Sequence, residues 1–247
     1  MGLDQDTAVT EDIAGSIRQV QLSIAAAAEQ ADRPPESVTL VAVSKGQPTA
    51  RIRKAYAAGL REFGENRVEE AAWKLDELSD LSGVHWHLIG HIQSRKTEGA
   101  SGRFHLIHSV DRLKIARRLD QYSADLGIRQ AVLLECNVSG ETSKGGWAMS
   151  DPARWAGRLE ELEQVVGLPS LQIQGLMTMA PLTPDEGLIR SVFHRLRVLQ
   201  EYLEQRLPGH WSELSMGMSD DYRLAIAEGA TIVRIGRAIF GPGEVEG

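Results

Sequence analysis

A lysine at the end of a short apolar run is the first residue of this chain whose position suggests chemistry. Residues 38–43 read VTLVAV, and Lys45 follows in the turn that begins at Ser44 and ends at Pro48. An uncharged lysine amine attacks an aldehyde and forms a Schiff base. Because most loop lysines are only surface charge, Lys45 becomes a candidate site only if a second feature supports it.

That second feature lies near the end of the chain. Residues 214–221 read LSMGMSDD, and in them Ser215, Gly217 and Ser219 alternate just before a predicted helix that begins near Asp220. Backbone N–H groups at a helix start, with small hydroxyl residues and glycine around them, are able to hold a phosphate group. The alternative is an ordinary cap, in which the Ser219 side chain caps the helix.

The elements that must position these residues alternate between strand and helix. Strand-like runs lie at 38–43, 60–64, 84–89, 105–110, 130–138, 172–179, 211–216 and 231–236. Helix-like stretches lie at 49–58, 66–80, 94–100, 112–125, 151–166, 186–206 and 220–228. This alternation predicts a parallel sheet with crossover helices and, on a chain of this length, a closed (β/α)8 TIM barrel. An open doubly wound sheet is the alternative, but residues 44–48 lack the glycine-rich fingerprint expected after its first strand.

Polar side chains recur where the predicted strands end. They include Lys45, Asn66, Asp111, Asn137 and Arg234. In (β/α)8 barrels the active site lies at the carboxyl ends of the strands, and phosphate is often held after the last two. We therefore expect these side chains and the 214–221 loop to share one face.

An extra helix is predicted before the first strand, because Ile13, Ile17, Val20 and Ile24 form an apolar stripe at helical spacing. Residues 1–9 are expected to be disordered.

Composition indicates one globular domain over residues 1–247, with 42% hydrophobic residues and a net charge of −7. This charge argues against nucleic-acid binding. The sequence contains neither a membrane-length apolar run nor a secretory signal. Its one cysteine, Cys136, lies in an apolar run and is expected to be buried. We expect a cytoplasmic protein and a monomer.

Taken together, these motifs resemble the pyridoxal phosphate homeostasis protein family (YggS/PROSC type). The matching stretches are AVSK at 42–45, FGENRVEE at 63–70, WHLIGHIQSRK at 86–96, HSVD at 108–111, GLM at 175–177, LSMGMSDD at 214–221, VRIG at 233–236 and IFG at 239–241. They occur in order over nearly the whole chain. The resemblance implies a barrel like the N-terminal domain of alanine racemase, with pyridoxal 5′-phosphate (PLP) held as an aldimine on Lys45.

The resemblance also implies a set of cofactor-binding residues. It places Ser215, Gly217, Ser219 and Gly236 at the phosphate, Arg234 at the pyridine nitrogen, and Asn66 beside the ring. Many relatives carry Thr or Ser after the Arg-Ile-Gly stretch, where this chain has Arg237. The Arg237 side chain then either pairs with the phosphate or points away and leaves the backbone N–H to serve.

Two features argue against fast catalysis. A charged Arg234 disfavours protonation of the pyridine nitrogen and so weakens the ring as an electron sink. A racemase also needs a second acid/base on the opposite face of the substrate. In alanine racemase-like enzymes this group is a tyrosine from an added domain, which we do not expect here, and Tyr222 is the one tyrosine predicted near the mouth.

Two rival sites remain. Lys144, in the loop after the fifth strand, is the best alternative aldehyde-reactive amine. Five histidines fall between positions 85 and 108, with His85 and His87 on one strand face. They lack the cysteine or acidic partners of a metal site, so we expect no metal.

We predict a PLP-binding protein that buffers or delivers the cofactor inside the cell, with transient contacts to PLP-dependent apoenzymes. One alternative is a slow PLP-dependent amino acid racemase. Another is a non-covalent phosphate-ligand binder in which Lys45 is only a counterion.

Overall fold

The computed structural model describes residues 12–241. The expectation that residues 1–9 are disordered lies outside this part of the chain. Within it, no helix is both long and apolar enough to cross a bilayer.

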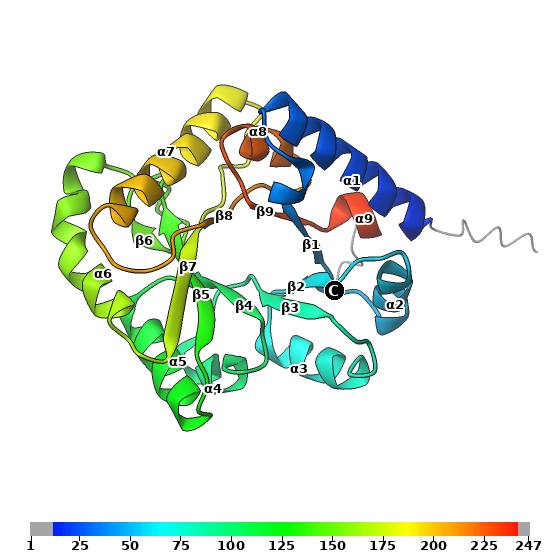
Figure 1. The fold of residues 1–247 in the computed structure, drawn as a ribbon, viewed down its shortest axis with the longest axis horizontal. Coiled ribbons are helices and arrows are strands. Elements are labelled where there is room, and N and C mark those ends of the chain that lie inside the picture. The colour runs from blue at the N-terminus through cyan, green and yellow to red at the C-terminus, as the bar shows by residue number, and fades with distance from the viewer. Residues whose placement is uncertain (1–11, 242–247) are drawn as a thin grey trace, which may run out of the picture.

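Parallel strands form a closed barrel. The strands are β1 (Thr39–Val43), β2 (Glu62–Glu65), β3 (His85–Leu88), β4 (Leu106–Val110), β5 (Gln130–Asn137), β6 (Trp147–Ala148), β7 (Leu171–Met177), β8 (Glu213–Ser215) and β9 (Ile232–Ile235). The ring runs β1-β2-β3-β4-β5-β7-β8-β9 and closes where β9 pairs with β1. Short β6 pairs with the end of β5, outside the ring. The predicted (β/α)8 barrel is confirmed, and Figure 1 shows the ring of strands inside its coat of helices.

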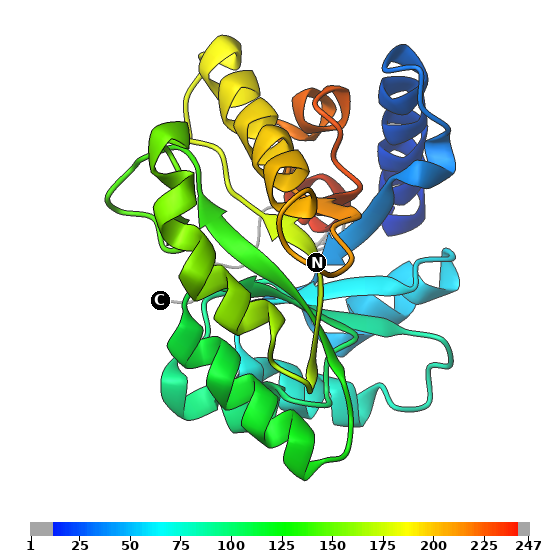
Figure 2. The same ribbon diagram turned by 60° about the vertical axis from the view of Figure 1, so that its left-hand side comes forward.

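Helices cover the outside of the barrel, as two views 60° apart show (Figures 1 and 2). The α-helices are α1 (Ile13–Gln30), α2 (Thr49–Ala57), α3 (Val68–Glu77), α4 (Thr97–Ala100), α5 (Leu113–Asp125), α6 (Leu159–Val166), α7 (Glu186–Glu204), α8 (Tyr222–Ala227) and α9 (Arg237–Phe240). The 3₁₀ turns are η1 (Pro35–Ser37), η2 (Ser94–Lys96) and η3 (Pro152–Arg158). Sequence periodicity missed α9, because four residues are too few to show a helical repeat.

The helix after β8 begins later than predicted. Met218 N–H donates to Asp221 Oδ1 at 2.6 Å, and Tyr222 N–H donates to Met218 O at 2.9 Å. These bonds close a turn before the first helical residue, so α8 begins at Tyr222. The Ser219 side chain does not cap α8, and that alternative for the loop is wrong.

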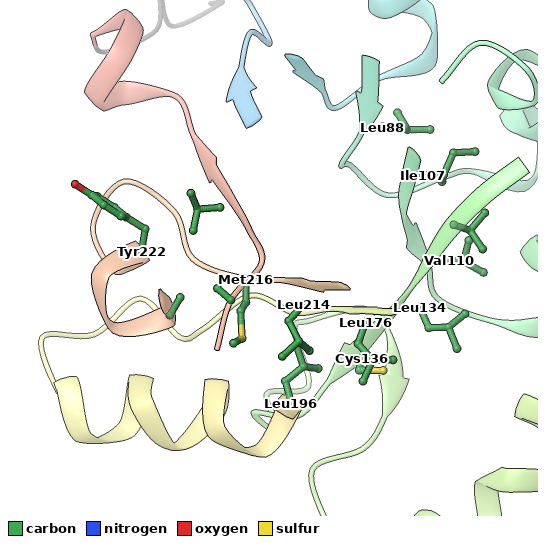
Figure 3. Close-up of a cluster of buried hydrophobic side chains, with 14 of the residues drawn as sticks. Leu88, Ile107, Val110, Leu134, Cys136, Leu176, Leu196, Leu214, Met216 and Tyr222 are labelled. Atoms are coloured by element: carbon green, nitrogen blue, oxygen red, sulfur yellow. The ribbon is translucent and has the colours of Figure 1, made fainter. Parts of the chain in front are cut away.

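The main core lies between the strands and the helices. Figure 3 shows part of it, where Leu196 of α7 packs toward Leu176 of β7 and Leu214 of β8. Cys136 is buried in the same layer, as predicted. The α1 stripe is also buried, and α1 packs against α8 and α9. Full burial of such an aliphatic side chain contributes about 1.5–3 kcal/mol.

A smaller apolar cluster fills the barrel interior. Its members are Val41, Leu106, Leu133, Met177 and Ile232. In a strand, alternate residues point to opposite faces, so the neighbours two positions further along also face inward. They include His108, Glu135 and Arg234, and the barrel interior is therefore polar on the side nearer the strand ends.

Candidate functional site

A pocket of about 550 Å³ opens where the strands end, and this is within the usual range for small-molecule sites. Its lining comes from the ends of several strands and from the loops that follow them. It consists of Val43, Lys45, Asn66, Ile89, Gly90, His91, Glu135, Ser143, Lys144, Gly145, Met179, Met218 and Arg234. The pocket thus contains Lys45, Asn66 and Arg234 from the predicted site, together with the rival Lys144.

Lys45 presents an unpaired amine to this pocket. It follows β1 and is exposed at the mouth. Within residues 12–241, no hydrogen bond or ion pair engages its ammonium group. Among the described residues, no carboxylate therefore competes with a pocket ligand for this amine.

The backbone on both sides of Lys45 is held by charged side chains of β2 and α3. Lys74, from α3, donates to Ser44 O at 2.8 Å and to Glu65 Oε1 at 3.0 Å. Glu65 accepts from the Ser44 hydroxyl at 2.6 Å, and Glu70 accepts from Gly46 N–H at 2.6 Å. Burial raises the pKa of Glu65, while Lys74 and the Ser44 hydroxyl work to lower it. These contacts fix the residues before and after Lys45.

Arg234 lies on the inner wall of the pocket and is almost completely buried. It donates from Nη1 to Ser215 Oγ at 2.5 Å and from Nη2 to Thr178 O at 3.0 Å. Burial lowers the pKa of Arg234 to about 10, while the nearby carboxylates of Asp221 and Glu135 work to raise it. The guanidinium is therefore charged near neutral pH and rigidly held.

Glu135 is a pocket residue that the sequence reasoning missed. It is only 6% exposed, and no hydrogen bond engages its carboxyl in the described part of the chain. Burial, followed by the charge of Asp111, raises its pKa to about 7, although Arg234 and Arg112 work in the opposite direction. A carboxyl with this pKa exchanges a proton near neutral pH. An acidic residue inside the apolar run 131–136 was the available signal.

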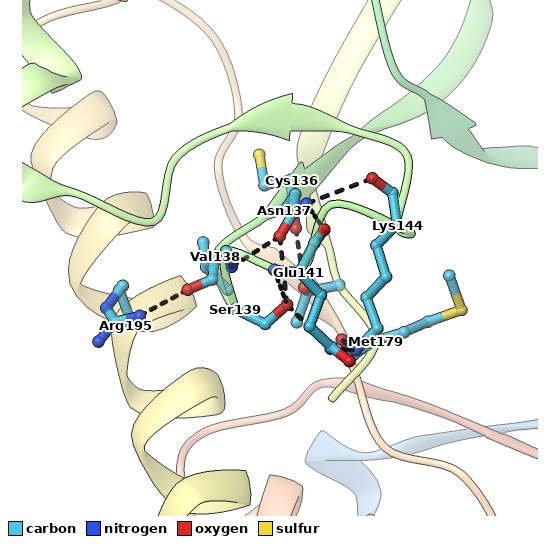
Figure 4. Close-up of polar contacts among 10 residues, drawn as sticks. Cys136, Asn137, Val138, Ser139, Glu141, Lys144, Met179 and Arg195 are labelled. Atoms are coloured by element: carbon cyan, nitrogen blue, oxygen red, sulfur yellow. Dashed lines mark hydrogen bonds and ion pairs between the residues drawn. The ribbon is translucent and has the colours of Figure 1, made fainter. Parts of the chain in front are cut away.

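The rival lysine, Lys144, is paired. Its ammonium forms an ion pair with Glu141 and donates to Met179 O at 3.1 Å. Asn137 holds the loop by donating to Glu141 O at 2.8 Å and by accepting from Gly140 N–H at 2.9 Å (Figure 4). Lys144 therefore faces the same pocket as Lys45, but its ammonium group is engaged by Glu141 and Met179 O.

The predicted phosphate loop is only partly at the pocket. Gly217 has φ +94°, and a Cβ there would lie 2.6 Å from the Ala225 Cβ, so only glycine fits. Met218 lines the pocket, whereas the Ser215 hydroxyl is buried against Arg234. Ser219 lines a separate cavity of about 620 Å³ between α1 and α8.

Of the last two predicted phosphate residues, Gly236 caps α9, and Arg237 pairs with Asp220. The first N–H groups of a helix have no partner within it, which leaves the α9 start able to donate. In this structure the Arg237 charge is thus directed to a carboxylate, and its predicted role at the phosphate stays a prediction.

In the part of the chain that the structure describes, neither a tyrosine nor a metal cluster completes the site. Tyr222 donates its hydroxyl to Ser23 Oγ of α1 at 2.8 Å, and none of the tyrosines lines the pocket in the described structure. Over residues 12–241, no three His, Cys, Asp or Glu side chains are arranged to hold a metal ion. His85 and His87 instead both bond to Glu62, at 2.8 and 2.7 Å.

Comparison with known proteins places the whole barrel in one sequence family. The family model described as "Alanine racemase, N-terminal domain" matches residues 19–243. The pyridoxal phosphate homeostasis protein of Pseudomonas aeruginosa is 48% identical over 93% of this chain and 95% of its own length. The protein of the same name from Escherichia coli K12 is 42% identical over 93% of this chain and 96% of its own length.

A solved structure gives the same result. PipY of Synechococcus elongatus PCC7942, determined with PLP bound, superimposes with a TM-score of 0.78 at 41% identity. The match covers 93% of this chain and all of PipY.

Proposed function

This chain belongs to the pyridoxal phosphate homeostasis protein family, and on that premise we propose that it binds PLP in the pocket at the strand ends and contributes to intracellular PLP homeostasis. The observation that carries the proposal is the meeting of an unpaired lysine amine with a rigid, buried arginine in one pocket. Bound PLP would supply an aldehyde and an electron-withdrawing ring.

We assign the covalent bond with the PLP aldehyde to Nζ of Lys45. Lys45 is supported over Lys144 because Lys144 is engaged by Glu141 and by Met179 O. The fixed positions of Ser44 and Gly46 direct Lys45 toward the pocket. Asn66 lies at the pocket wall beside Gly90. A Cβ added to Gly90 would lie 2.2 Å from Asn66 O, so a glycine is needed for the two residues to lie this close. This close approach allows Asn66 to line the ring site.

The phosphate is assigned to the loop of Ser215, Gly217 and Ser219 and to the start of α9 at Gly236 and Arg237. Two features support this assignment: the loop conformation, which requires Gly217, and the first N–H groups of α9, which have no partner within that helix. Arg234 is assigned to the pyridine nitrogen, since its guanidinium is fixed at the inner wall of the pocket.

The function we favour is that of a carrier or regulator of PLP and not of an enzyme. A charged Arg234 disfavours a protonated pyridine ring, which carbanion chemistry needs. Tyr222, the one tyrosine predicted near the mouth, is bonded to α1 instead. Transient delivery to PLP-dependent apoenzymes, a cytoplasmic location and a monomeric state are further parts of this proposal. Light scattering during gel filtration measures the last of these.

The first experiment is an absorbance spectrum of the protein with PLP, before and after borohydride, followed by peptide mapping. We expect a visible band that disappears on reduction, with the adduct on Lys45. Lys45→Ala should abolish the band, and the matched control Lys144→Ala should retain it. An adduct mainly on Lys144, or a band that survives in Lys45→Ala, would contradict the site assignment. Saturable PLP binding without any band would favour the non-covalent alternative.

Slow racemisation is the second candidate function, and Glu135 is the observation that favours it. Its carboxyl lies at the pocket wall with a pKa raised to about 7, as an acid/base group would require. Turnover of L-alanine or L-serine to the D-enantiomer, followed by chiral chromatography, tests it. Turnover that is lost in Glu135→Gln would support the racemase, and absence of turnover in PLP-loaded protein would exclude it for these substrates.

A further inference from the structure

A continuous chain of buried hydrogen bonds crosses the barrel interior and ends on Arg234. Its links are Arg234 Nη1 to Ser215 Oγ at 2.5 Å, Ser215 Oγ to His108 Nδ1 at 2.8 Å, His108 Nε2 to His87 Nδ1 at 2.9 Å, and His87 Nε2 to Glu62 Oε2 at 2.7 Å. Five strands contribute one residue each. Every member except Glu62 is almost completely buried. Glu62 begins β2, so it lies at the end of the barrel opposite the pocket.

The two ends of the hydrogen-bond chain set the direction of its outermost bonds. A guanidinium only donates, so Ser215 Oγ accepts from Arg234. At the other end, burial works to raise the pKa of Glu62, but hydrogen bonds from His87 and His85 outweigh it and hold that pKa below the ordinary value. An ionised carboxylate only accepts, and His87 must therefore carry a proton on Nε2.

The proton positions on the two histidines follow from these constraints when both rings are neutral. Burial, followed by the charges of His87 and Arg234, keeps the pKa of His108 well below its usual value, so His108 is neutral. When His87 is neutral too, its Nδ1 accepts from His108 Nε2–H, and His108 Nδ1 accepts the Ser215 hydroxyl proton. All donors then point from the Arg234 cation toward the Glu62 anion. Such aligned bonds polarise one another in a low-dielectric interior.

Arg234 depends on this hydrogen-bond chain for its hydrogen bond to another side chain, Ser215. Besides Ser215, its hydrogen-bond partner in the described structure is a backbone carbonyl, Thr178 O at 3.0 Å. The charged groups that act on it from the neighbouring elements are Asp221 and Glu135. Of the three carboxylates Asp221, Glu135 and Glu62, Glu62 is the one that a continuous series of hydrogen bonds links to Arg234.

We propose that Glu62, acting through His87, His108 and Ser215, is a remote positioning residue that holds the Arg234 guanidinium against the cofactor ring. The inference deepens the proposed function and rests on it for the identity of the ligand. The end of the barrel opposite the pocket thereby influences the electronic environment of PLP at the strand ends.

The variant that tests this inference is Glu62→Gln, because it removes the charge and keeps an acceptor of similar shape. Loss of a charge-assisted bond weakens the polarisation of the whole chain. We expect PLP to bind about fivefold more weakly, equivalent to about 1 kcal/mol. We also expect a shifted absorbance maximum and a changed ¹⁵N chemical shift of the pyridine nitrogen in labelled PLP.

The matched control is His85→Gln. His85 bonds to the other oxygen of the same carboxylate, at 2.8 Å, but lies outside the chain to Arg234 and is half exposed. Because glutamine keeps a side-chain donor for Glu62, this replacement should leave the PLP spectrum unchanged and the affinity within about twofold. A Glu62→Gln protein that folds and shows the wild-type spectrum and affinity would overturn the inference.

A measurement on the wild-type protein without PLP separates this inference from the proposed function. ¹⁵N NMR of the imidazoles at pH 8 should show the proton on Nε2 of both His87 and His108. A proton on His108 Nδ1 would overturn the proposed direction of the chain, whether or not PLP binds. If these tautomers are found and PLP does not bind, the proposed function fails and the hydrogen-bond chain stands.

Discussion

At the scale of single residues, burial without a hydrogen-bond partner among the described residues changes the chemistry of Glu135. Its carboxyl lies in the pocket wall with Asp111 as a like-charged neighbour, and its pKa is raised to about 7. Such a shift costs folding free energy once the group is ionised. Buried carboxyls that carry such a cost are found preferentially at functional sites.

This cost gives a stability prediction with a defined pH dependence. The folded state retains the Glu135 proton between the ordinary carboxyl pKa and about 7, whereas the unfolded state releases it. Stability therefore falls as the pH rises through this window. Glu135→Gln removes the effect and should stabilise the protein at pH 8, by up to the order of 3 kcal/mol. At pH 4.5 the same substitution should leave the free energy of unfolding almost unchanged.

Urea unfolding at the two pH values measures this difference. Glu141→Gln is a control whose expected stability change has the opposite sign. The hydrogen bond from Lys144 holds the pKa of Glu141 below the ordinary value. That variant should lose a little stability at pH 8. Equal unfolding midpoints for wild type and Glu135→Gln at pH 8 would show that Glu135 is solvated.

At the scale of elements, a buried ion pair fastens α3 to the ends of β1 and β2. Lys74 is 1% exposed and bonds to Glu65, to Glu70 and to Ser44 O. The desolvation cost of buried charges is offset only when every partner is in place. The main effect of these contacts is therefore to fix the backbone on both sides of Lys45.

Lys74→Met is expected to destabilise the protein by about 3–5 kcal/mol, because two carboxylates lose their shared cation. It should also slow the appearance of the PLP absorbance band, since Ser44 loses its donor. Both effects are measured by chemical denaturation and by stopped-flow mixing.

The surface variant Lys54→Met, at an exposed position of α2, is the control and should stay within about 0.5 kcal/mol of the wild-type stability. The double variant Lys74→Met with Glu65→Gln should recover part of the loss, because it removes one of the unpaired charges. No recovery would show that lost packing, and not charge, is the cause.

At the scale of the whole molecule, PLP binding should stabilise the entire barrel. The pocket draws residues from β1, β5 and β9 and from the loops beside β2, β3 and β7, so its ligand bridges elements far apart in the chain. A ligand that binds only the folded state adds about 2.7 kcal/mol at a hundred times its Kd.

Thermal unfolding with increasing PLP measures this linkage, and the midpoint should rise with the logarithm of PLP concentration. Lys45→Ala should lose most of the shift, because the covalent contribution is absent. An unfolding midpoint independent of PLP in the wild type would contradict specific binding to the folded barrel.

Local patterns in the sequence determined the elements and the face on which the site lies. The alternation of short apolar runs with amphipathic stretches is a local property, and it predicted the eight-strand barrel. The α1 stripe of Ile13, Ile17, Val20 and Ile24 was found in the same way and is buried. Lys45 and Asn66 were identified because they follow strands, and both line the pocket.

Only the tertiary structure decided which distant side chains meet inside the barrel. The partners Glu62, His87, His108, Ser215 and Arg234 come from five strands, and a shift of one residue in any strand would turn its member outward. The same holds for Lys74, a helix lysine whose ammonium group lies in the core beside Glu65. Contacts of this kind depend on register and closure, which arise from the packing of the whole chain and leave no local pattern in the sequence.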